Sequence, residues 1–486
     1  MIIRALFIGY CLLLTTTTIH ADELADSTRF FGKAPAYAGI NIVFETYENF
    51  IIPSTMPLAS MPINDDGTFD FTFPLSETTY AFADLGRYRA SIYLEPGKAY
   101  QLVFPPFQPK TEVERLNPHF QQEKVLLGIA NPESRLLNRN ITEFDAEFDF
   151  LLSQYAVQLF MQTDTAKARE LHTALDQKYT FDHLIFHRHK QLSFLKLWQP
   201  ALRRQERQVM ANLIDTPVEY HLPVYWDVFN ALFRGFFPNG FQAEVRPQVL
   251  KAIGQRAAFQ QIVNSAMLDT LFTNRALTEI VLLNGLYEAY YNKTLTEATV
   301  LHVLDNATLG ASTLETREMA RQFYQKTAML RPGTAAPDFQ LTDAKGKRKT
   351  LSDYRGKFVY LNFMHTQNYA CQKDLMVLEQ FHRLMRKELE IVTIVLDESY
   401  EAMELFVKNN PYKWDFLHFA TAPQILETYN IMAVPAYYLI DPHGQLSLSP
   451  APAPEEYFRE RFAERFLQFQ REELRRNPPK ERSIFR

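Results

Sequence analysis

Cysteine is scarce in this sequence, since only Cys11 and Cys371 occur among 486 residues. Two cysteines cannot build a disulfide framework, so the folded chain depends on packed cores for its stability. Positive charge is not in excess either: the formal net charge is -5, which gives no general attraction to nucleic acid or anionic membranes. The sequence also lacks a Walker loop, a dinucleotide fingerprint and a Gly-x-Ser-x-Gly elbow, so we expect no cofactor.

Apolar and aromatic residues, in contrast, are abundant. They include 39 phenylalanines and 24 tyrosines, and the hydrophobic fraction is 47%. A chain of this length exceeds the size of one ordinary core, so we expect about two to four domains. Nothing in the composition indicates disorder or a fibrous repeat.

The N-terminus has the pattern of an export signal over residues 1–21. Arg4 provides the positive start, residues 5–14 are apolar, and small Ala21 ends a plausible cleavage site. The apolar stretch is shorter than the roughly 20 residues that a membrane-spanning helix needs. A bulky tyrosine directly before Cys11 argues against lipid attachment. We therefore expect an exported mature protein without a transmembrane segment, in which Cys371 is the one cysteine left.

The rest of the chain divides into regions that differ in the spacing of their apolar and turn-forming residues. Residues 28–110 contain short alternating apolar runs between Gly, Pro and Asp turns, which predicts an antiparallel β-sandwich-like domain. The turns at residues 65–67 and 95–98 are each typical of a hairpin. Residues 132–330 show three-to-four-residue apolar spacing, which predicts an all-α domain.

A cluster of turn residues at 331–337 marks the best domain boundary. Beyond it, strand and helix patterns alternate over residues 333–470, as in an α/β domain. The expected strands cover residues 357–363, 390–396 and 436–440, the last two as buried parallel strands, and a helix is expected from Cys371 to residue 388. A basic tail, residues 471–486, follows an amphipathic helix at residues 454–474.

Four motifs in the third region resemble the thioredoxin-like domain of the TlpA and peroxiredoxin (AhpC/TSA) superfamily. They lie at residues 336–339, 351–357, 361–363 and 429–441, in the order and spacing of that superfamily. The resemblance implies a thioredoxin-like fold, descent from thiol–disulfide oxidoreductases, and a cis-proline at Pro435. The β region and helical region ahead of this domain also resemble envelope proteins of Gram-negative bacteria, which implies a periplasmic or cell-envelope location.

The presumed redox loop departs from the superfamily pattern. The family usually has Trp-Ala-x-Trp-Cys-x-x-Cys, whereas Met364, Gln367 and Asn368 replace the two tryptophans and the nucleophilic cysteine. Cys371 occupies the second cysteine position, and one sulfur alone cannot resolve a mixed disulfide within the site. Asn362 stands where some thioredoxins bury a proton-accepting Asp.

Three functions remain open at this point. The resemblance implies that Val434, Pro435 and Tyr369 contact an extended protein or peptide partner, which needs no dithiol cycle. Alternatively, Cys371 acts as a monothiol, forming mixed disulfides or reducing peroxide with an external resolving thiol, because a helix start favours a thiolate. The simpler alternative to a reactive thiol is that Cys371 is a small, buried residue of the apolar core. In the third case the function lies in the helical region, which a deep polar cleft among its helices would favour.

Two further groups of polar residues have simpler interpretations. His183, His187 and His189 include a spacing of four that suits a metal, but no third ligand follows, so we expect a solvated helix surface and no metal site. Asp374 and Glu379 occupy helix positions that are usually exposed to solvent.

Overall fold

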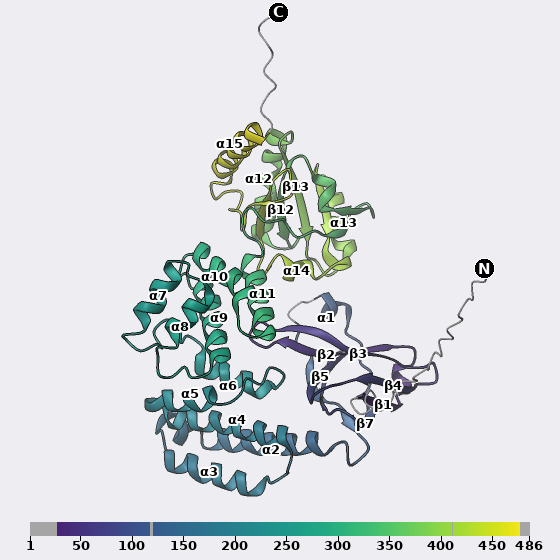
Figure 1. The fold of residues 1–486 in the computed structure, drawn as a ribbon. Helices are drawn as coiled ribbons and strands as arrows, with labels where there is room; N and C mark the ends of the chain where they lie inside the picture. Colours follow the sequence, from purple (N-terminus) through teal and green to yellow (C-terminus); the bar gives the residue numbers. More distant parts are fainter. Residues whose placement is uncertain (1–26, 117–119, 411, 477–486) are drawn as a thin grey trace, which may run out of the picture. The chain divides into compact units, whose positions relative to one another are not determined.

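The computed structural model describes residues 27–116, 120–410 and 412–476, and the export-signal pattern and most of the basic tail lie outside these ranges. The chain divides into two compact units (Figure 1). Of the residues that the structure describes, the first unit contains 27–109 and 122–321, and the second contains 110–116, 120–121 and 322–476 apart from 411. The described residues contain no helix that is both long enough and apolar enough to cross a membrane.

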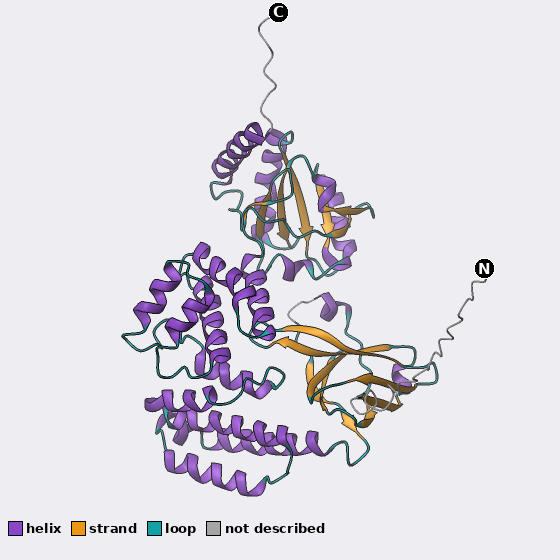
Figure 2. Ribbon diagram, in the orientation of Figure 1, coloured by secondary structure: helices purple, strands orange, loops and turns teal. Residues whose placement is uncertain are grey.

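The first unit begins with two β-sheets, drawn in orange in Figure 2. One sheet has the strand order β4-β1-β7-β9 and the other β3-β2-β5-β6-β8. Phe30 and Phe44 come from different sheets, and their rings lie 4.8 Å apart in the core between them. The strands are β1 (Ser27–Lys33), β2 (Asn41–Asn49), β3 (Ser54–Pro62), β4 (Thr68–Pro74), β5 (Thr79–Leu85), β6 (Tyr88–Leu94), β7 (Ala99–Val103), β8 (Glu123–Leu126) and β9 (Gly128–Ile129).

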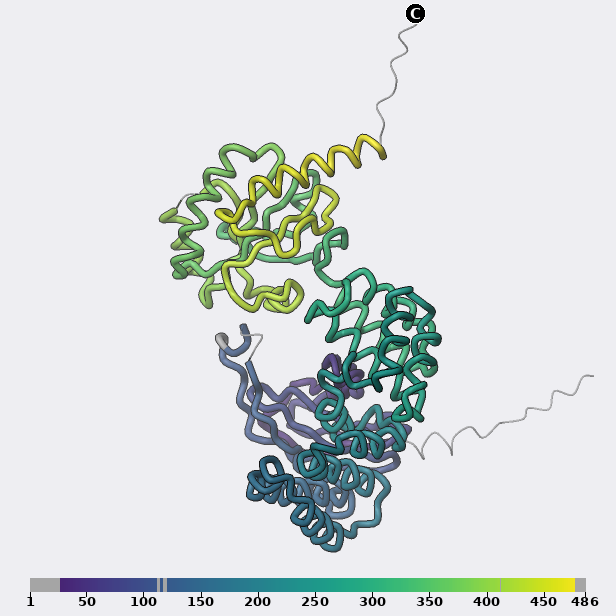
Figure 3. The backbone as a smooth tube through the Cα atoms, turned by 90° about the vertical axis from the view of Figure 1, so that its left-hand side faces the viewer, coloured from purple at the N-terminus to yellow at the C-terminus, as the bar shows by residue number. Residues whose placement is uncertain are grey.

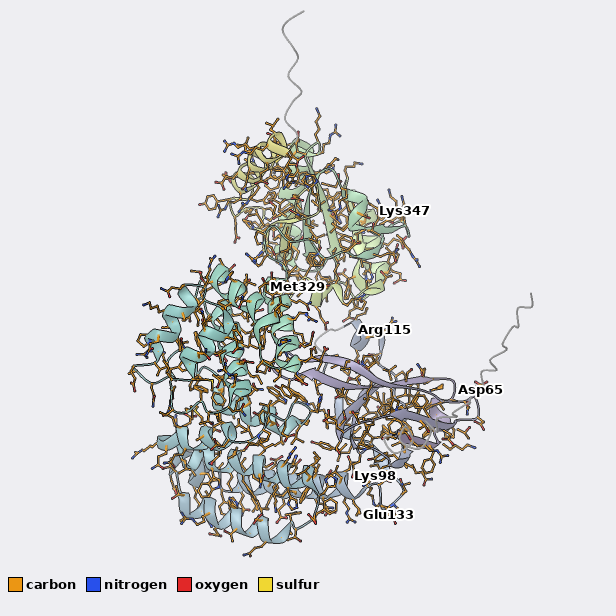
Figure 4. The ribbon with its side chains drawn as sticks, viewed as in Figure 1. Asp65, Lys98, Arg115, Glu133, Met329 and Lys347 are labelled. Carbon is orange, nitrogen blue, oxygen red and sulfur yellow. The ribbon has the colours of Figure 1, made fainter. Side chains whose placement is uncertain are left out.

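The pairing of these strands refines the sequence prediction. Most neighbours are antiparallel, as expected, but β1 pairs with β7 and β6 pairs with β8 in parallel. The two turns predicted as hairpins are instead corners that carry the chain from one sheet to the other, and Figure 4 labels Asp65 and Lys98 within them. Alternation shows which side chains face the core, but it does not show which strand is the neighbour. The hairpin predictions were therefore wrong.

The central region of the first unit is helical, which confirms the predicted all-α fold class of this region (Figure 3, blue to teal). Its aromatic residues fill interfaces between helices, with Tyr225 and Phe229 fully buried. The helices are α2 (Leu136–Gln154), α3 (Thr165–Lys178), α4 (Leu184–Ala201), α5 (Glu206–Ile214), α6 (Pro223–Phe233), α7 (Arg246–Gly254), α8 (Phe259–Ala266), α9 (Arg275–Tyr291), α10 (Glu297–Gly310) and α11 (Leu314–Ala328), the last of which continues past Arg321 into the second unit.

The second unit is built on a mixed sheet of order β11-β10-β14-β13-β12-β15-β16, which confirms the predicted α/β thioredoxin-like fold. Its central strand β12 pairs in parallel with β13, as predicted, and antiparallel with β15. The prediction of a parallel strand at residues 436–440 was therefore wrong, because a buried apolar run does not show the direction of its neighbours. The elements are α1 (Glu112–Leu116), β10 (Gln340–Asp343), β11 (Arg348–Thr350), β12 (Phe358–Met364), α12 (Tyr369–Met385), β13 (Leu389–Val395), α13 (Tyr400–Asn409), β14 (Asp415–His418), α14 (Ile425–Thr428), β15 (Ala436–Ile440), β16 (Leu446–Leu448) and α15 (Phe458–Arg476).

Every residue of β12 is buried, because this strand lies in the middle of the sheet with a core on each face. Tyr360 and Met364 face the core that contains Cys371 and the apolar side of α12. Leu361 and Phe363 face the opposite core. The short loop between β12 and α12 is thus held between two rigid elements at the carboxyl end of the central strand, where open α/β sheets place their ligands.

Candidate functional site

Asn368, which stands in place of the nucleophilic cysteine, is the N-cap of α12. Its backbone is extended, and its side-chain oxygen accepts a hydrogen bond from the backbone N–H of Cys371 at 3.2 Å. Asparagine is among the best N-cap residues because its side chain satisfies an amide that the helix leaves unpaired. The replacement therefore supplies a local structural bond where the family supplies an attacking sulfur.

Cys371 lies in the first turn of α12 and is buried, with 1% of its surface exposed. Burial raises the pKa of its thiol, and the nearby Asp374 carboxylate adds to this effect. The backbone N–H groups of His365 and Cys371 act in the opposite direction but do not outweigh burial. The neutral thiol is thus favoured, because desolvation outweighs the backbone hydrogen bonds that stabilise the thiolate.

Asp374 lies one turn further along α12 and is buried, so the expectation of solvent exposure was wrong for this residue. The Tyr437 hydroxyl of β15 donates a hydrogen bond of 2.5 Å to its carboxylate. Burial raises the pKa of Asp374, and the bond from Tyr437 partly offsets that rise. Helix periodicity missed the contact because it does not show which neighbouring strand carries a polar partner.

Asn362 is buried in the middle of β12, and neither atom of its side-chain amide has a hydrogen-bond partner in the described chain. It pairs in register with Thr393 of β13 and Tyr437 of β15, so the three side chains leave the sheet on the same face. This is the face that α12 covers. A polar row therefore runs beneath the helix that carries Cys371.

Asp397, just after β13, holds the β12–α12 loop in place through hydrogen bonds to its carboxylate. It accepts hydrogen bonds from the Thr366 backbone N–H at 2.8 Å, from the Thr366 hydroxyl, and from His365 Nδ1 at 3.3 Å. Burial opposes ionisation of this carboxyl group, but the bonds from His365 and Thr366 outweigh it and lower the pKa of Asp397. Sequence reasoning missed this residue, although an Asp directly after a buried parallel strand is a usable signal.

The peptide bond between Val434 and Pro435 is cis. Phe363 pairs with Ala436 at the end of the antiparallel ladder of β12 and β15, so Pro435 directly precedes the last paired residue of β15. Residues 432–435 form no backbone hydrogen bond to any described residue. The N–H groups of residues 432–434 and the C=O groups of residues 432–435 therefore have no backbone partner among the described residues.

Two large apolar side chains near this loop are exposed. Tyr369, the first residue of α12, is 80% exposed, and Met432 is 73% exposed. The sequence-predicted site residues thus separate into two sets. Tyr369, Val434 and Pro435 lie at or near the surface, whereas Cys371 lies beneath it.

The three histidines near the start of α4 do not share a site. His183 Nε2 lies 3.0 Å from Glu95, and His187 Nε2 lies 3.2 Å from Asp182. His189 is buried and lies 2.6 Å from Asp145, so the expectation of a solvated surface was wrong for it. Within the described ranges, no group of three His, Cys, Asp or Glu side chains is arranged to hold a metal ion.

The central β12, the helix α12 that follows it, and the cis peptide ahead of β15 define the second unit as a thioredoxin-like domain. Residues 332–449 match the AhpC/TSA family. A stretch of 125 residues is 34% identical to the thiol-disulfide oxidoreductase ResA of Geobacillus kaustophilus, covering 26% of this chain and 71% of that protein. The chain therefore belongs, through its C-terminal domain, to the AhpC/TSA family of thioredoxin-like proteins and is related to the ResA-type thiol-disulfide oxidoreductases.

Further likenesses involve a similar share of the chain. ResA of Bacillus subtilis is 34% identical over 115 residues, which are 24% of this chain and 64% of that protein. The thioredoxin domain of a thiol-disulfide oxidoreductase from Bacteroides vulgatus is 22% identical, with a TM-score of 0.25 and coverage of 28% of this chain and 97% of that chain. A putative thiol:disulfide interchange protein DsbE from Chlorobium tepidum is 24% identical, with a TM-score of 0.26 and coverage of 28% and 97%.

Proposed function

We propose that this protein is an exported binding protein whose thioredoxin-like domain holds an extended segment of a partner protein or peptide without a dithiol redox cycle. The observation that carries the proposal is the unpaired backbone of residues 432–435 beside a buried Cys371. The relatives are named as thiol-disulfide oxidoreductases. This chain has no Cys-x-x-Cys pair.

Binding needs only the groups that remain at this site. An extended peptide that lies along residues 432–435 gains main-chain hydrogen bonds in the way an added strand does. The exposed Tyr369 and Met432 side chains offer apolar surface to such a peptide. Partner side chains that are buried against Tyr369 and Met432 would add to the binding free energy of the main-chain hydrogen bonds. This contact would favour apolar residues in the partner.

Redox chemistry lacks support at the same site. A monothiol mechanism requires an accessible thiolate at Cys371. Burial removes access and raises the pKa of this thiol, and Asn368 is engaged in capping α12. These three facts favour binding over the monothiol alternative.

Export is supported by the charge and apolar pattern of residues 1–21. The proposal places the mature protein in the periplasm or cell envelope of a Gram-negative bacterium. N-terminal sequencing of the chain expressed with its own leader tests this part. A mature N-terminus near Asp22 is expected, and an intact leader in the cytoplasmic fraction would contradict export.

The binding proposal is tested by selecting peptides from a displayed library of random sequences on the immobilised mature protein. Affinities of the selected peptides are then measured for the Tyr369→Ser and Met432→Ser variants. Both side chains are exposed, so these variants keep the fold while removing apolar contact. Leu384→Ser is the matched control, because Leu384 is a comparably exposed apolar residue near the far end of α12.

We expect each site variant to weaken peptide binding at least about fivefold, with no change for the control. Peptides that bind all the variants with equal affinity would contradict the proposed site. Failure to select any peptide over a bare support would contradict the binding function itself.

A further inference from the structure

A separate feature of the first unit is a cavity of about 450 Å³ where the β-sheet meets the helical region. This volume is within the usual range for small-molecule sites. Its walls come from β5, β6, α2, α4 and α6. The polar and aromatic residues that line it are Tyr80, Ser91, Tyr93, Asn138, Thr142, Asp145, Phe148, Asp149, His189, Ser193, Lys196 and Asp227.

Asn138 fixes the wall that α2 contributes. Its side-chain oxygen accepts a hydrogen bond of 2.7 Å from the Tyr93 N–H, and its side-chain nitrogen donates one of 2.8 Å to the Tyr93 carbonyl. This pair of bonds completes the free edge of Tyr93 as another strand would. Tyr80 lies directly opposite Tyr93 in the β5–β6 ladder, and their rings are 5.1 Å apart. The sheet therefore presents an aromatic wall in a defined position.

The carboxylates around the cavity outnumber the cationic side chains that pair with them. Asp145 pairs with His189 at 2.6 Å, and Asp227 pairs with Lys196 at 3.2 Å. Asp149 has no ion pair or hydrogen bond from any described side chain and is exposed at the cavity's rim. Partial desolvation of the Asp149 carboxyl group at the rim and the charge of the neighbouring Asp145 raise its pKa, and the charge of Lys196 offsets this rise only in part.

Polar groups inside the cavity are also left without partners. Ser193 is 2% exposed, and its hydroxyl has no hydrogen-bond partner in the described chain. His189 Nδ1 is buried and unpartnered as well. His189, Ser193 and Lys196 follow each other at helical spacing on one face of α4. Buried polar groups are normally satisfied, so their state here indicates a place for a ligand or solvent.

We propose that this cavity binds a small organic cation of the alkylammonium class. The ammonium group donates hydrogen bonds to Asp149 at the rim and to the Ser193 hydroxyl within, while its alkyl part lies against Tyr80, Tyr93 and Phe148. An alkylammonium suits these walls because carboxylates attract it and aromatic faces accept both its charge and its alkyl chain. An anion would meet unpaired carboxylate charge, since Lys196 is already held by Asp227.

The same chemistry has two sources: a free amine, or the lysine side chain of another protein. The cavity lies outside the thioredoxin-like domain, so the inference is independent of the peptide-binding proposal. It agrees with the third interpretation of the sequence, in which the helical region carries a function of its own. Titration calorimetry with both kinds of probe separates the two sources.

The experiment uses the mature full chain with n-butylamine and with the α-acetylated amide of lysine. n-Butanol and butyrate have the same alkyl body without the positive charge. We expect saturable binding of an amine and at least about tenfold weaker binding of the alcohol and the acid. Tighter binding of butylamine would identify a free amine as the ligand, and tighter binding of the lysine amide would identify a protein side chain. Absence of saturable binding by either amine would overturn the proposal, as would equal binding of the alcohol.

Two isosteric variants locate the site. Asp149→Asn removes the unpaired charge, and Ser193→Ala removes the unpaired hydroxyl, each without a change in packing volume that would disturb folding. Asp305→Asn is the matched control, since Asp305 is an exposed carboxylate on α10 away from the cavity lining. The first variant is expected to weaken amine binding at least about tenfold and the second about threefold, with the melting temperature retained. Unchanged affinity in both variants would overturn the assignment of the cavity.

Discussion

Asn368 accepts a hydrogen bond from the backbone N–H of Cys371, at 3.2 Å, across the first turn of α12. In a dithiol enzyme these two positions carry the sulfurs that exchange electrons. Here one position caps a helix and the other fills a core. The side chains at these two positions therefore serve the stability of the domain.

The cap itself can be tested by substitution. Asn368→Ala removes the acceptor for the Cys371 N–H and is expected to lower the free energy of unfolding by roughly 1 kcal/mol. Asn368→Asp retains an oxygen at the same place and is the matched control. Chemical denaturation of both variants provides the measurement. Equal stability of the alanine variant and the parent would show that the cap contributes nothing.

The unsatisfied Asn362 gives a prediction of opposite sign. Both polar atoms of its buried amide lack partners in the described chain, so Asn362→Leu replaces an unpaired polar group with an apolar one of similar size. We expect the variant to be more stable by about 1 to 3 kcal/mol. Denaturant unfolding checks this value. Lower stability would mean that a bound water or ligand satisfies the amide in solution.

The bond between Tyr437 and Asp374 has a measurable consequence for ionisation. Tyr437→Phe removes the hydroxyl that offsets the effect of burial, so the pKa of Asp374 should rise further above its ordinary value. Stability should fall by about 1 to 2 kcal/mol near neutral pH, because a buried carboxylate loses its donor. Carboxyl NMR titration and denaturant unfolding measure the two effects. An unchanged Asp374 pKa would contradict the contact.

His418 predicts how stability depends on pH. Its Nε2 bonds to the Asp397 carbonyl at 2.8 Å, and burial lowers the pKa of the imidazole. The folded state therefore binds a proton less readily than the unfolded state does. The free energy of unfolding should fall as pH decreases below about 6.5, until the folded pKa is passed.

The comparison that isolates this residue is His418→Gln, which retains polar atoms but does not titrate. Its free energy of unfolding should change less than that of the parent between about pH 5 and about pH 6.5. The other histidines are the same in both proteins, so their contributions cancel in the comparison. Identical pH profiles for the two proteins would rule out a contribution from His418.

Much of the fold could be predicted from local pattern, because strand and helix periodicity depend on near neighbours in the chain. The buried runs at β13 and β15 are examples, and their observed bounds differ from the expected ones by at most one residue. The partners of each strand were harder to predict. The turn between β3 and β4 is typical of a hairpin, yet the two strands belong to different sheets. The pairing of a strand depends on the packing of the whole core.

In the candidate site too, local features could be predicted from the sequence, whereas contacts between distant segments could not. The order of motifs placed Cys371, Val434 and Pro435 in one domain, and the structure has Cys371 in the first turn of α12 and a cis peptide between Val434 and Pro435, just before β15. The burial of Cys371 and the contacts of Asp374 and Asp397 arise between elements far apart in sequence. No single segment contains the information for such contacts, so sequence patterns alone left the state of the thiol open.

The most direct test of the central claim is the alkylation rate of Cys371 as a function of pH, on the mature protein, with Cys371→Ser as the blank. Asn368→Cys is the positive control, because it restores a sulfur at the more accessible first position. The account predicts negligible labelling of the native parent, full labelling after denaturation, and fast native labelling of the positive control. Rapid native labelling of Cys371 with an apparent pKa below the free-thiol value of about 8.5 would contradict it and support a monothiol enzyme.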